Sequence, residues 1–525
     1  MAQVKKSPKA LKRSVADPTD SYLTIKPLWK RSRAILQGQD TALAHDESVA
    51  DFDKNLLIPF SPTMSQPQYE FYKSEAELPG LISQYSKVLI SALLRKKSAL
   101  DLPDGVPEDA TDWIETNFTL DGGSLFNFLD TALWEELQTS RGWVYVDYPD
   151  VTQEVWDMMT PEQRNDIAPY PILIEAESVI NVQTRVHPLT RIKTVNRFVT
   201  RYLDTKYEAD NPWHPTYVDT VADHYLDEQG YFVIDIYQKA DANDIVQITN
   251  GEVRQDYKDS LSEGGFNKID TVIPQMFGKR IDKIPAWPLN GQVEPIEPIL
   301  MPLIEREIAL YNKISRRNHL LYGAATYTPI VKSDMSDEEF DKIVNAGLGT
   351  WLRVRSGEDI TVLETPTAAL ADMDRAIEAT VEEMAKMGIR MLTPEPAASG
   401  VALEIRNASQ TAQLGSLNAK VSGTMKEVIA FMLNWRYNTD FTGRDVEFQM
   451  SSDFSPMVGG DAAMRLVSEW YQTGLIPRTV FISIAKYNDF LPADYDDEAA
   501  ISEIQTDPLG MTTNGNTTDV QVEDE

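Results

Sequence analysis

The sequence predicts an α+β protein with several domains, and three observations lead to that prediction. In the second half of the chain, apolar residues recur every three or four positions over long stretches, which is the period of an amphipathic helix. In the middle, short β-branched and aromatic stretches alternate with polar turns, as in antiparallel sheets and unlike a series of βαβ units. The 525 residues, 42% of them hydrophobic, suffice for about three or four domains.

The first half of the chain predicts helices followed by strands. Helices are expected over 80–96 and over Ser124–Leu137, where apolar residues keep the helical period. The stretch Trp143–Pro149 is β-branched and aromatic, which predicts a strand that the proline ends. Several short antiparallel strands are expected between 172 and 250, including Arg191–Tyr202 and Tyr231–Gln238.

The centre of the prediction is a helix, a small insert and a second helix. Pro302 suits the first position of the first helix, Glu305 and Glu307 lie near the positive end of its dipole, and Gly323 can end it. The apolar side of this helix consists of Leu300, Ile304, Ile308, Tyr311 and Ile314. In the insert we expect strands at Tyr327–Val331, Trp351–Arg355 and Ile360–Leu363, and a short helix at Asp337–Asn345.

The second helix follows Thr365-Pro366 and carries a row of carboxylates beside its apolar stripe. Asp374, Glu378 and Glu382 are spaced four residues apart, and like charges at that spacing slightly destabilise a helix. Two interpretations remain open on the residues alone: a solvated acidic face, or a surface kept acidic for function. The apolar stripe predicts a seam against another helix and consists of Leu370, Met373, Ile377, Thr380, Met384, Met387 and Met391.

Beyond the second helix, the prolines and Ser399-Gly400 predict a loop before a long helix. That helix is expected from Asn407 to Trp435, followed by a strand at Val446–Met450 and by two short helices that Gly474 and Pro477 separate. The buried side of the long helix is predicted to contain Leu414, Leu417, Val421, Val428, Met432 and Trp435.

Composition and charge exclude several classes of protein. The chain has no cysteine, which excludes disulfides, thiolate metal sites and cysteine nucleophiles. It has no signal-peptide pattern and no apolar stretch near ~20 residues, so we expect a protein that is not secreted and does not span a membrane. The formal net charge of −32 argues against an ordinary DNA-binding protein, because the surface repels phosphates.

The charges are unevenly distributed toward the two ends of the chain. Bases gather in Lys5–Arg13 and Lys26–Arg33, whereas from Asp489 onward the chain carries acids and no bases. We therefore expect residues 1–50 to form a mobile basic arm, with one short helix near Pro27–Leu36, and residues 508–525 to form an acidic tail.

Motifs for catalysis or cofactor binding are not found. The five histidines have no metal-ligand spacing, and the glycine pairs fit neither a phosphate loop nor a dinucleotide fingerprint. Acid pairs such as Asp147 with Asp150 arise by chance in a chain with 81 acidic residues. We expect no catalytic residue, no metal and no cofactor, hence a protein that is not an enzyme.

Five stretches occur in an order and spacing that resembles a known family, and none of them is a catalytic motif. They are Arg141–Pro149, Pro171–Asn181, Ile284–Asn290, Ser399–Leu403 and Trp470–Pro477. On these stretches the chain resembles the portal proteins of tailed bacteriophages, in the branch whose members are often labelled only as a domain of unknown function. The resemblance covers most of the chain and leaves out the basic arm and the acidic tail.

The resemblance implies a ring, usually of twelve subunits, at one capsid vertex of the virion. Double-stranded DNA is packaged and later ejected through such a ring, which assembles in the host cytoplasm. The partners implied are terminase, a neck or tail adaptor, and capsid and scaffold proteins. The segments implied are a wing (51–296), two stem helices (297–323 and 367–392) around a clip (324–366), a tunnel loop (393–407), a long wing helix with a strand (408–455) and a crown (456–507).

The resemblance also gives candidate site residues a role. A duplex carries one negative charge per ~1.7 Å, so an acidic tunnel wall lets DNA slide without holding it. Our hypothesis is that Asp374, Glu378 and Glu382 line the channel, with Lys386 and Arg390 making transient phosphate contacts at its wider end. The tunnel loop is expected to be a mobile constriction that touches DNA, through Pro396, Ala397, Ala398, Ser399, Gly400 and Val401. The clip is expected to bind partner proteins through Asp337, Glu338, Glu339, Trp351 and Arg353.

A second class of protein remains open. A non-portal head–tail adaptor, or another structural protein of the virion, would share the acidity and the expected lack of cofactors. Such a protein does not need a helix, insert and helix followed by a broken long helix. A nuclease, in contrast, would need carboxylates clustered around a metal ion.

Overall fold

The computed structural model describes residues 14–107, 109–149, 155, 158–160, 167–186, 191, 193–208, 211–239, 266–325, 328–332, 336, 359–363, 367–387, 400–451, 468–473, 475, 477–478 and 480–482. Internal contacts divide the chain into two units, Met1–Asp453 and Phe454–Glu525. The first unit is α+β, as predicted, and all strand pairs in the described residues are antiparallel.

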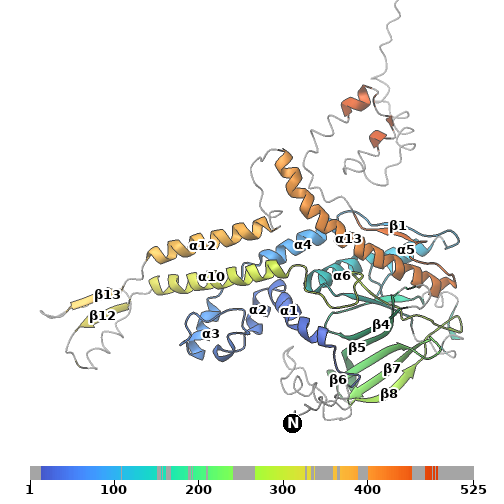
Figure 1. Cartoon of the computed structure of the whole chain (residues 1–525), viewed down its shortest axis with the longest axis horizontal. Coiled ribbons are helices and arrows are strands. Elements are labelled where there is room, and N and C mark those ends of the chain that lie inside the picture. The colour runs from blue at the N-terminus through green and yellow to red at the C-terminus, as the bar shows by residue number, and fades with distance from the viewer. Residues whose placement is uncertain are drawn as a thin grey trace, which may run out of the picture. The chain divides into compact units, whose positions relative to one another are not determined.

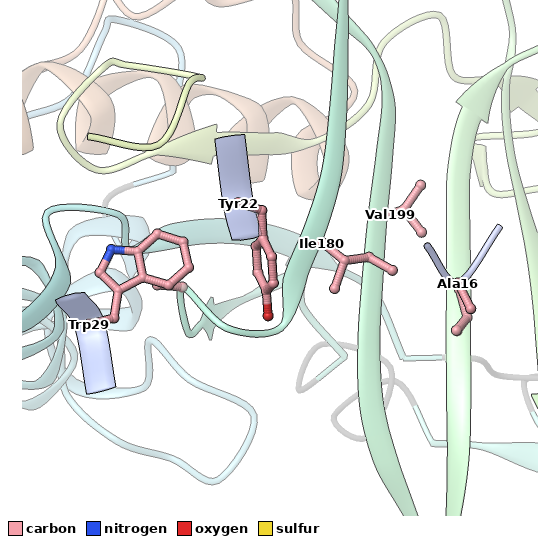
Figure 2. Close-up of a cluster of buried hydrophobic side chains, with 7 residues drawn as sticks. Ala16, Tyr22, Trp29, Ile180 and Val199 are labelled. Atoms are coloured by element: carbon pink, nitrogen blue, oxygen red, sulfur yellow. The ribbon is translucent and has the colours of Figure 1, made fainter. Parts of the chain in front are cut away.

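The N-terminal part of the first unit differs most from the expectation. Residues Asp20–Leu36 form a helix of 17 residues, α1, and Thr19 caps it by accepting a hydrogen bond from the Tyr22 amide at 3.2 Å. Trp29 is fully buried, and Figure 2 shows it beside Tyr22, which faces Ile180 of the sheet. The expectation of a mobile arm over 1–50 is therefore wrong from residue 14 onward, while residues 1–13 lie outside the described residues.

The short helix expected near Pro27–Leu36 is the second half of α1, and two features of the sequence concealed the first half. Pro27 lies inside α1, although proline normally marks a helix start, and the bases of the segment interrupt its apolar side. One of those bases, Arg33, holds the helix in place. Its guanidinium donates to Glu177 at 2.8 and 2.7 Å, to Glu135 at 2.8 Å and to Gln138 at 3.0 Å. Such bidentate bonds fix orientation as well as position.

A layer of helices follows α1. The predicted helices over 80–96 and Ser124–Leu137 are confirmed as α4 and α6, and the Ser124 hydroxyl caps α6 by accepting from the Asn127 amide at 3.2 Å. The helices of this layer are α2 (Gln39–His45), the short 3-10 helix η1 (Val49–Asp51), α3 (Gln66–Ser74), α4 (Leu81–Leu93), α5 (Asp109–Thr116) and α6 (Leu125–Thr139).

The strand predicted at Trp143–Pro149 is confirmed as β2 (Trp143–Asp147), which lies between β3 (Tyr170–Ile174) and β11 (Ala286–Pro288). Gly142 precedes it, and a Cβ at that position would overlap the buried side chain of Leu289. Glycine therefore fits there without a shift of Leu289.

A second sheet contains five strands in the order β4-β5-β6-β7-β8. It confirms the antiparallel strands expected in this part of the chain. One face packs on α1 through Val199, and the other packs through Phe198, whose ring centroid lies 4.9 Å from that of Trp143. The strands are β4 (Val179–Val186), β5 (Lys193–Glu208), β6 (Asn211–Leu226), β7 (Phe232–Lys239) and β8 (Phe266–Val272).

His224 illustrates the buried face of this sheet. Its ring stacks on Phe232, and burial lowers its pKa to about 3. The histidine is therefore neutral in the folded protein and is a core residue of the sheet.

The two central helices are present, and Figure 1 shows them side by side with the small strands at one end. α10 (Met301–Ala325) runs through Gly323, so this glycine does not end the helix as expected. β12 (Thr328–Lys332) pairs with β13 (Asp359–Leu363), which confirms two of the three strands expected in the insert, and α12 (Thr367–Lys386) follows. The expected strand 351–355 and helix 337–345 lie outside the described residues.

The long helix α13 (Gly400–Tyr437) begins earlier than the expected start at Asn407. A glycine costs little there, because amides of the first turn have no partner within the helix. The predicted apolar side of the helix is buried. It consists of Leu414, Leu417, Val421, Val428, Met432 and Trp435. The predicted strand near Val446–Met450 is β14 (Glu447–Gln449), which pairs with β1 (Ala99–Asp101). One further pair joins β9 (Gln275–Met276) and β10 (Lys279–Arg280).

Few residues of the second unit are described. Helical residues lie on both sides of the break predicted at Gly474 and Pro477, and the rings of Tyr471 and Phe481 stack at 4.8 Å. Within the described ranges of both units, the helices are too short or too polar to cross a bilayer.

Candidate functional site

The α10–α12 pair carries the acidic row that the sequence analysis singled out. Arg306 contacts Glu383 at 3.6 Å, the Lys313 ammonium donates to the Ala376 carbonyl at 3.3 Å, and Arg317 pairs with Asp374. As the residue number rises along α10 it falls along α12, so the two helices are antiparallel. Three basic residues on one side of α10, Arg306, Lys313 and Arg317, therefore contact α12 along its length.

The apolar seam of α12 is only partly buried. Thr380 and Met384 are buried against α10, whereas Leu370, Met373 and Ile377 are half-buried. Met387, just after the helix, is 41% exposed, and Met391 lies outside the described residues. The predicted seam is therefore confirmed at Thr380 and Met384 and is more exposed on both sides of these two residues.

The acidic row is less negative than the sequence implied, because bases accompany it. Asp374 pairs with Arg317, and Glu382 pairs with Lys386 at 2.8 Å, one turn further along α12. Asp372 pairs with Arg375 on the same helix. In the described part of the chain, no base lies within ion-pair distance of Glu378, which is exposed. Most of the row is neutralised within one subunit, and Glu378 carries the remaining charge.

The signal for this pairing was present in the sequence. Arg306, Lys313 and Arg317 are separated by seven and four residues, which places them on one side of a helix. The sequence analysis considered the acids of α12 alone, because only the tertiary structure shows which side of α10 meets them.

The other candidate residues have different outcomes. Gly400 and Val401 were expected in the tunnel loop but form the start of α13, so the helix begins before the predicted end of the loop at residue 407. Pro396, Ala397, Ala398, Ser399 and Arg390 lie outside the described residues. So do the five residues of the clip: Asp337, Glu338, Glu339, Trp351 and Arg353. Whether Asp374, Glu378, Glu382 and Lys386 line a channel stays a prediction.

A buried carboxylate connects the first half of α10 to the start of α4. Glu307 of α10 is fully buried and accepts hydrogen bonds from the amides of Leu81 at 2.7 Å and Ile82 at 2.9 Å. It therefore caps α4, whereas the sequence placed it only near the positive end of the dipole of its own helix. Burial raises the pKa of Glu307, against the lowering effect of these amides. No local pattern in the sequence indicates this contact, since more than 200 residues separate the partners.

An apolar pocket of about 240 Å³ lies at the N-terminal end of α10. It is lined by side chains from α4, α6, α13 and the first turn of α10, by the two residues before α10 and by Met387, and the lining offers no carboxylate, histidine or lysine. Among the described residues, no group of three or more acids or histidines could hold a metal ion. The lining residues are Tyr85, Leu89, Leu137, Ile299, Leu300, Pro302, Leu303, Met387, Leu414 and Leu417.

Comparison with known proteins gives three findings. Residues 300–436, about a quarter of the chain, match the family model described as a domain of unknown function, DUF4055. No curated protein matches the chain. Among solved structures, the chain is similar to one from the neck of an empty GTA particle computed with C6 symmetry, with 11% identity and a TM-score of 0.36 over 77% of this chain and 88% of that one. It is also similar to one from the virion of a native gene transfer agent (GTA) particle, with 10% identity and a TM-score of 0.33 over 81% of this chain and 93% of that one.

Proposed function

We propose that this chain is the portal protein of a tailed-phage-like particle. Twelve copies would form a ring at one capsid vertex, a passive channel for double-stranded DNA and a docking site for terminase and for neck or tail proteins. The observation that carries the proposal is the antiparallel α10–α12 pair with the β12–β13 strands at its end, followed by the long helix α13. The portal resemblance implies this order of stem, clip, stem and wing helix.

In this proposal the protein is structural and has no catalytic step. Its residues position DNA and partner proteins, and the energy for DNA movement comes from the packaging motor. The match over residues 300–436 covers the stem, the clip and most of α13 in the proposed scheme. The proposed location is the virion, after assembly in the host cytoplasm.

The ion pairs of α12 refine the proposed channel wall. A strongly acidic wall would repel DNA, while a basic one would hold it through phosphate contacts. Exposed ion pairs have weak individual effects and present no strong field of either sign. We propose that DNA slides along a wall of paired charges with one unpaired carboxylate, Glu378, from each subunit.

Imaging of the purified full-length chain tests the proposal. A ring with a central hole of duplex width supports a portal, and a monodisperse monomer under all conditions contradicts it. Removal of the chain from a particle that encodes it separates the portal from the adaptor. Loss of a portal should leave heads without packaged DNA, whereas loss of an adaptor, which acts after DNA entry, should leave filled heads.

A further inference from the structure

An exposed aromatic patch lies where α3 meets the second half of α10. Phe60 is 37% exposed, Phe71 is 44% exposed and Tyr322 is 50% exposed. Their rings are in contact and form one surface with His319. The distances between ring centroids are 4.9 Å for His319 and Phe60, 6.5 Å for His319 and Phe71, and 5.3 Å for Tyr322 and Phe71. We call Phe60, Phe71, His319 and Tyr322 the aromatic patch. Large contiguous apolar surfaces of this kind mark protein–protein contacts.

The exposed charges of α3 and of the turn after it are carboxylates. Glu70 and Glu77 are exposed, while the one base of this segment, Lys73, is largely covered and pairs with Glu70 at 2.9 Å. Glu75 lies beside the patch and bonds to His319 at 2.8 Å. A surface that fits the aromatic patch should therefore be apolar at its centre and basic at its edge.

The outer side of α1 has this chemistry. Leu23 is 54% exposed, and Pro27 and Lys30 follow on the same side of the helix at positions four and seven residues later. Lys26 and Arg31 flank them. We call Leu23, Lys26, Pro27, Lys30 and Arg31 the basic face. It is a basic area on a chain whose formal net charge is −32.

We propose that the aromatic patch of one copy docks on the basic face of the next copy. The centres of both surfaces are exposed in the same chain, while Lys26, Arg31 and His319 are half-buried, so the two surfaces do not cover each other there. Pairing two aromatic patches would bring Glu70 and Glu77 toward their own counterparts, and pairing two basic faces would do the same with lysines. The contact is therefore between unlike surfaces, and a contact of that type closes into a ring when the rotation between copies allows it.

This inference rests on the proposed function, because the contact that it names is the one that closes the proposed ring.

The test uses the full-length chain with Phe71→Asp in the aromatic patch or Leu23→Asp in the basic face. Both positions are exposed, so the fold should tolerate the changes. Matched controls are Phe126→Asp on α6, at a residue 54% exposed, and Leu120→Asp, at a residue 67% exposed. Mass photometry and sedimentation velocity report the oligomeric state.

We expect each patch variant to associate at least about 30-fold more weakly than the wild type, the effect of losing one central interface residue, and each control to assemble normally. The decisive sample is an equal mixture of the two patch variants. Each copy then retains one intact surface, so one productive contact can form per pair. The mixture should give dimers and nothing larger.

Four outcomes would overturn the inference. If both patch variants assemble like the wild type, or if the mixture stays monomeric, the pairing is wrong while the portal proposal stands. If the wild-type chain is a monomer under all conditions, both fail together. If Lys30→Glu loses binding to a short double-stranded DNA and still assembles, the basic face serves DNA and not a second copy.

Discussion

The α10–α12 pair and the core around α13 contain the same kinds of apolar stripe but bury them differently. Val421, Met425 and Val428 of α13 are fully buried, while Met373 and Ile377 of α12 are only half-buried. α13 packs against β2, β11, β14 and α4, whereas α12 packs mainly along α10. The period of a stripe thus tells which side of a helix is apolar, and the number of neighbours decides how deeply that side is buried.

Carboxylates differ between the two regions in the same way. In the body of the first unit, Glu307 and Glu136 are buried and accept hydrogen bonds from backbone amides. On α12, Asp374 and Glu382 are exposed or half-buried and pair with bases. Buried acids therefore stabilise the fold by replacing missing backbone partners, and exposed acids mainly set the surface charge.

The largest expected contrast comes from one substitution made in both regions. Met425→Ala in α13 should lower the free energy of unfolding by about 2–5 kcal/mol, because it leaves a cavity in a packed core. Met373→Ala in α12 should cost less than about 1 kcal/mol, because solvent already reaches the site. Denaturant unfolding of both variants measures the difference. Equal losses would mean that α12 is as closely packed as α13.

A pH dependence should distinguish the buried acids. Burial raises the pKa of Glu136 from 4.5 to about 8, so the folded state holds this proton more tightly than the unfolded chain does. Stability should therefore fall as the pH rises from about 4.5 to about 8, and Glu136→Gln should remove this loss, up to a few kcal/mol at pH 9. The exposed Asp130→Asn on the same helix is the control. An unchanged pH profile in Glu136→Gln would contradict the assignment.

Removal of the α4 cap should have a smaller effect. Glu307→Gln keeps the shape of the side chain but loses a charged acceptor for two amides, at a cost of about 1.5–3 kcal/mol. Hydrogen exchange at Leu81 and Ile82 should increase with it. Glu305→Gln, exposed on the same helix, should stay within about 0.5 kcal/mol of the wild type. Similar losses in both variants would exclude a specific cap.

The smallest effect is expected for the partly exposed ion pair between α10 and α12. A double-mutant cycle of Arg317→Gln and Asp374→Asn should give a coupling energy of about 0.2–1 kcal/mol, and high salt should reduce it. Unfolding of the single and double variants at low and high salt measures this energy. A coupling of several kcal/mol that salt does not change would make this pair a structural element like Glu307.

The errors of the sequence analysis have specific physical causes. Only the second half of α1, near Pro27–Leu36, was predicted, because Pro27 and a series of bases interrupt the apolar pattern of the helix, although Thr19 and Asp20 mark a helix start. The charge of the acidic row was overestimated, because Arg306 and Arg317, which pair with acids of α12, come from another helix. Glu307 was assigned to its own helix because local rules consider only the nearest dipole.

The sequence alone determined the α+β class, the helices α4, α6, α10, α12 and α13, and the apolar side of each, because these follow from local period and capping. Only the tertiary structure decided which charges are paired, which acids are buried and which apolar surfaces stay exposed. Those outcomes depend on contacts between residues far apart in the chain. Asp374 meets Arg317, Ile82 meets Glu307, and the aromatic patch joins Phe71 to Tyr322 across more than 200 residues.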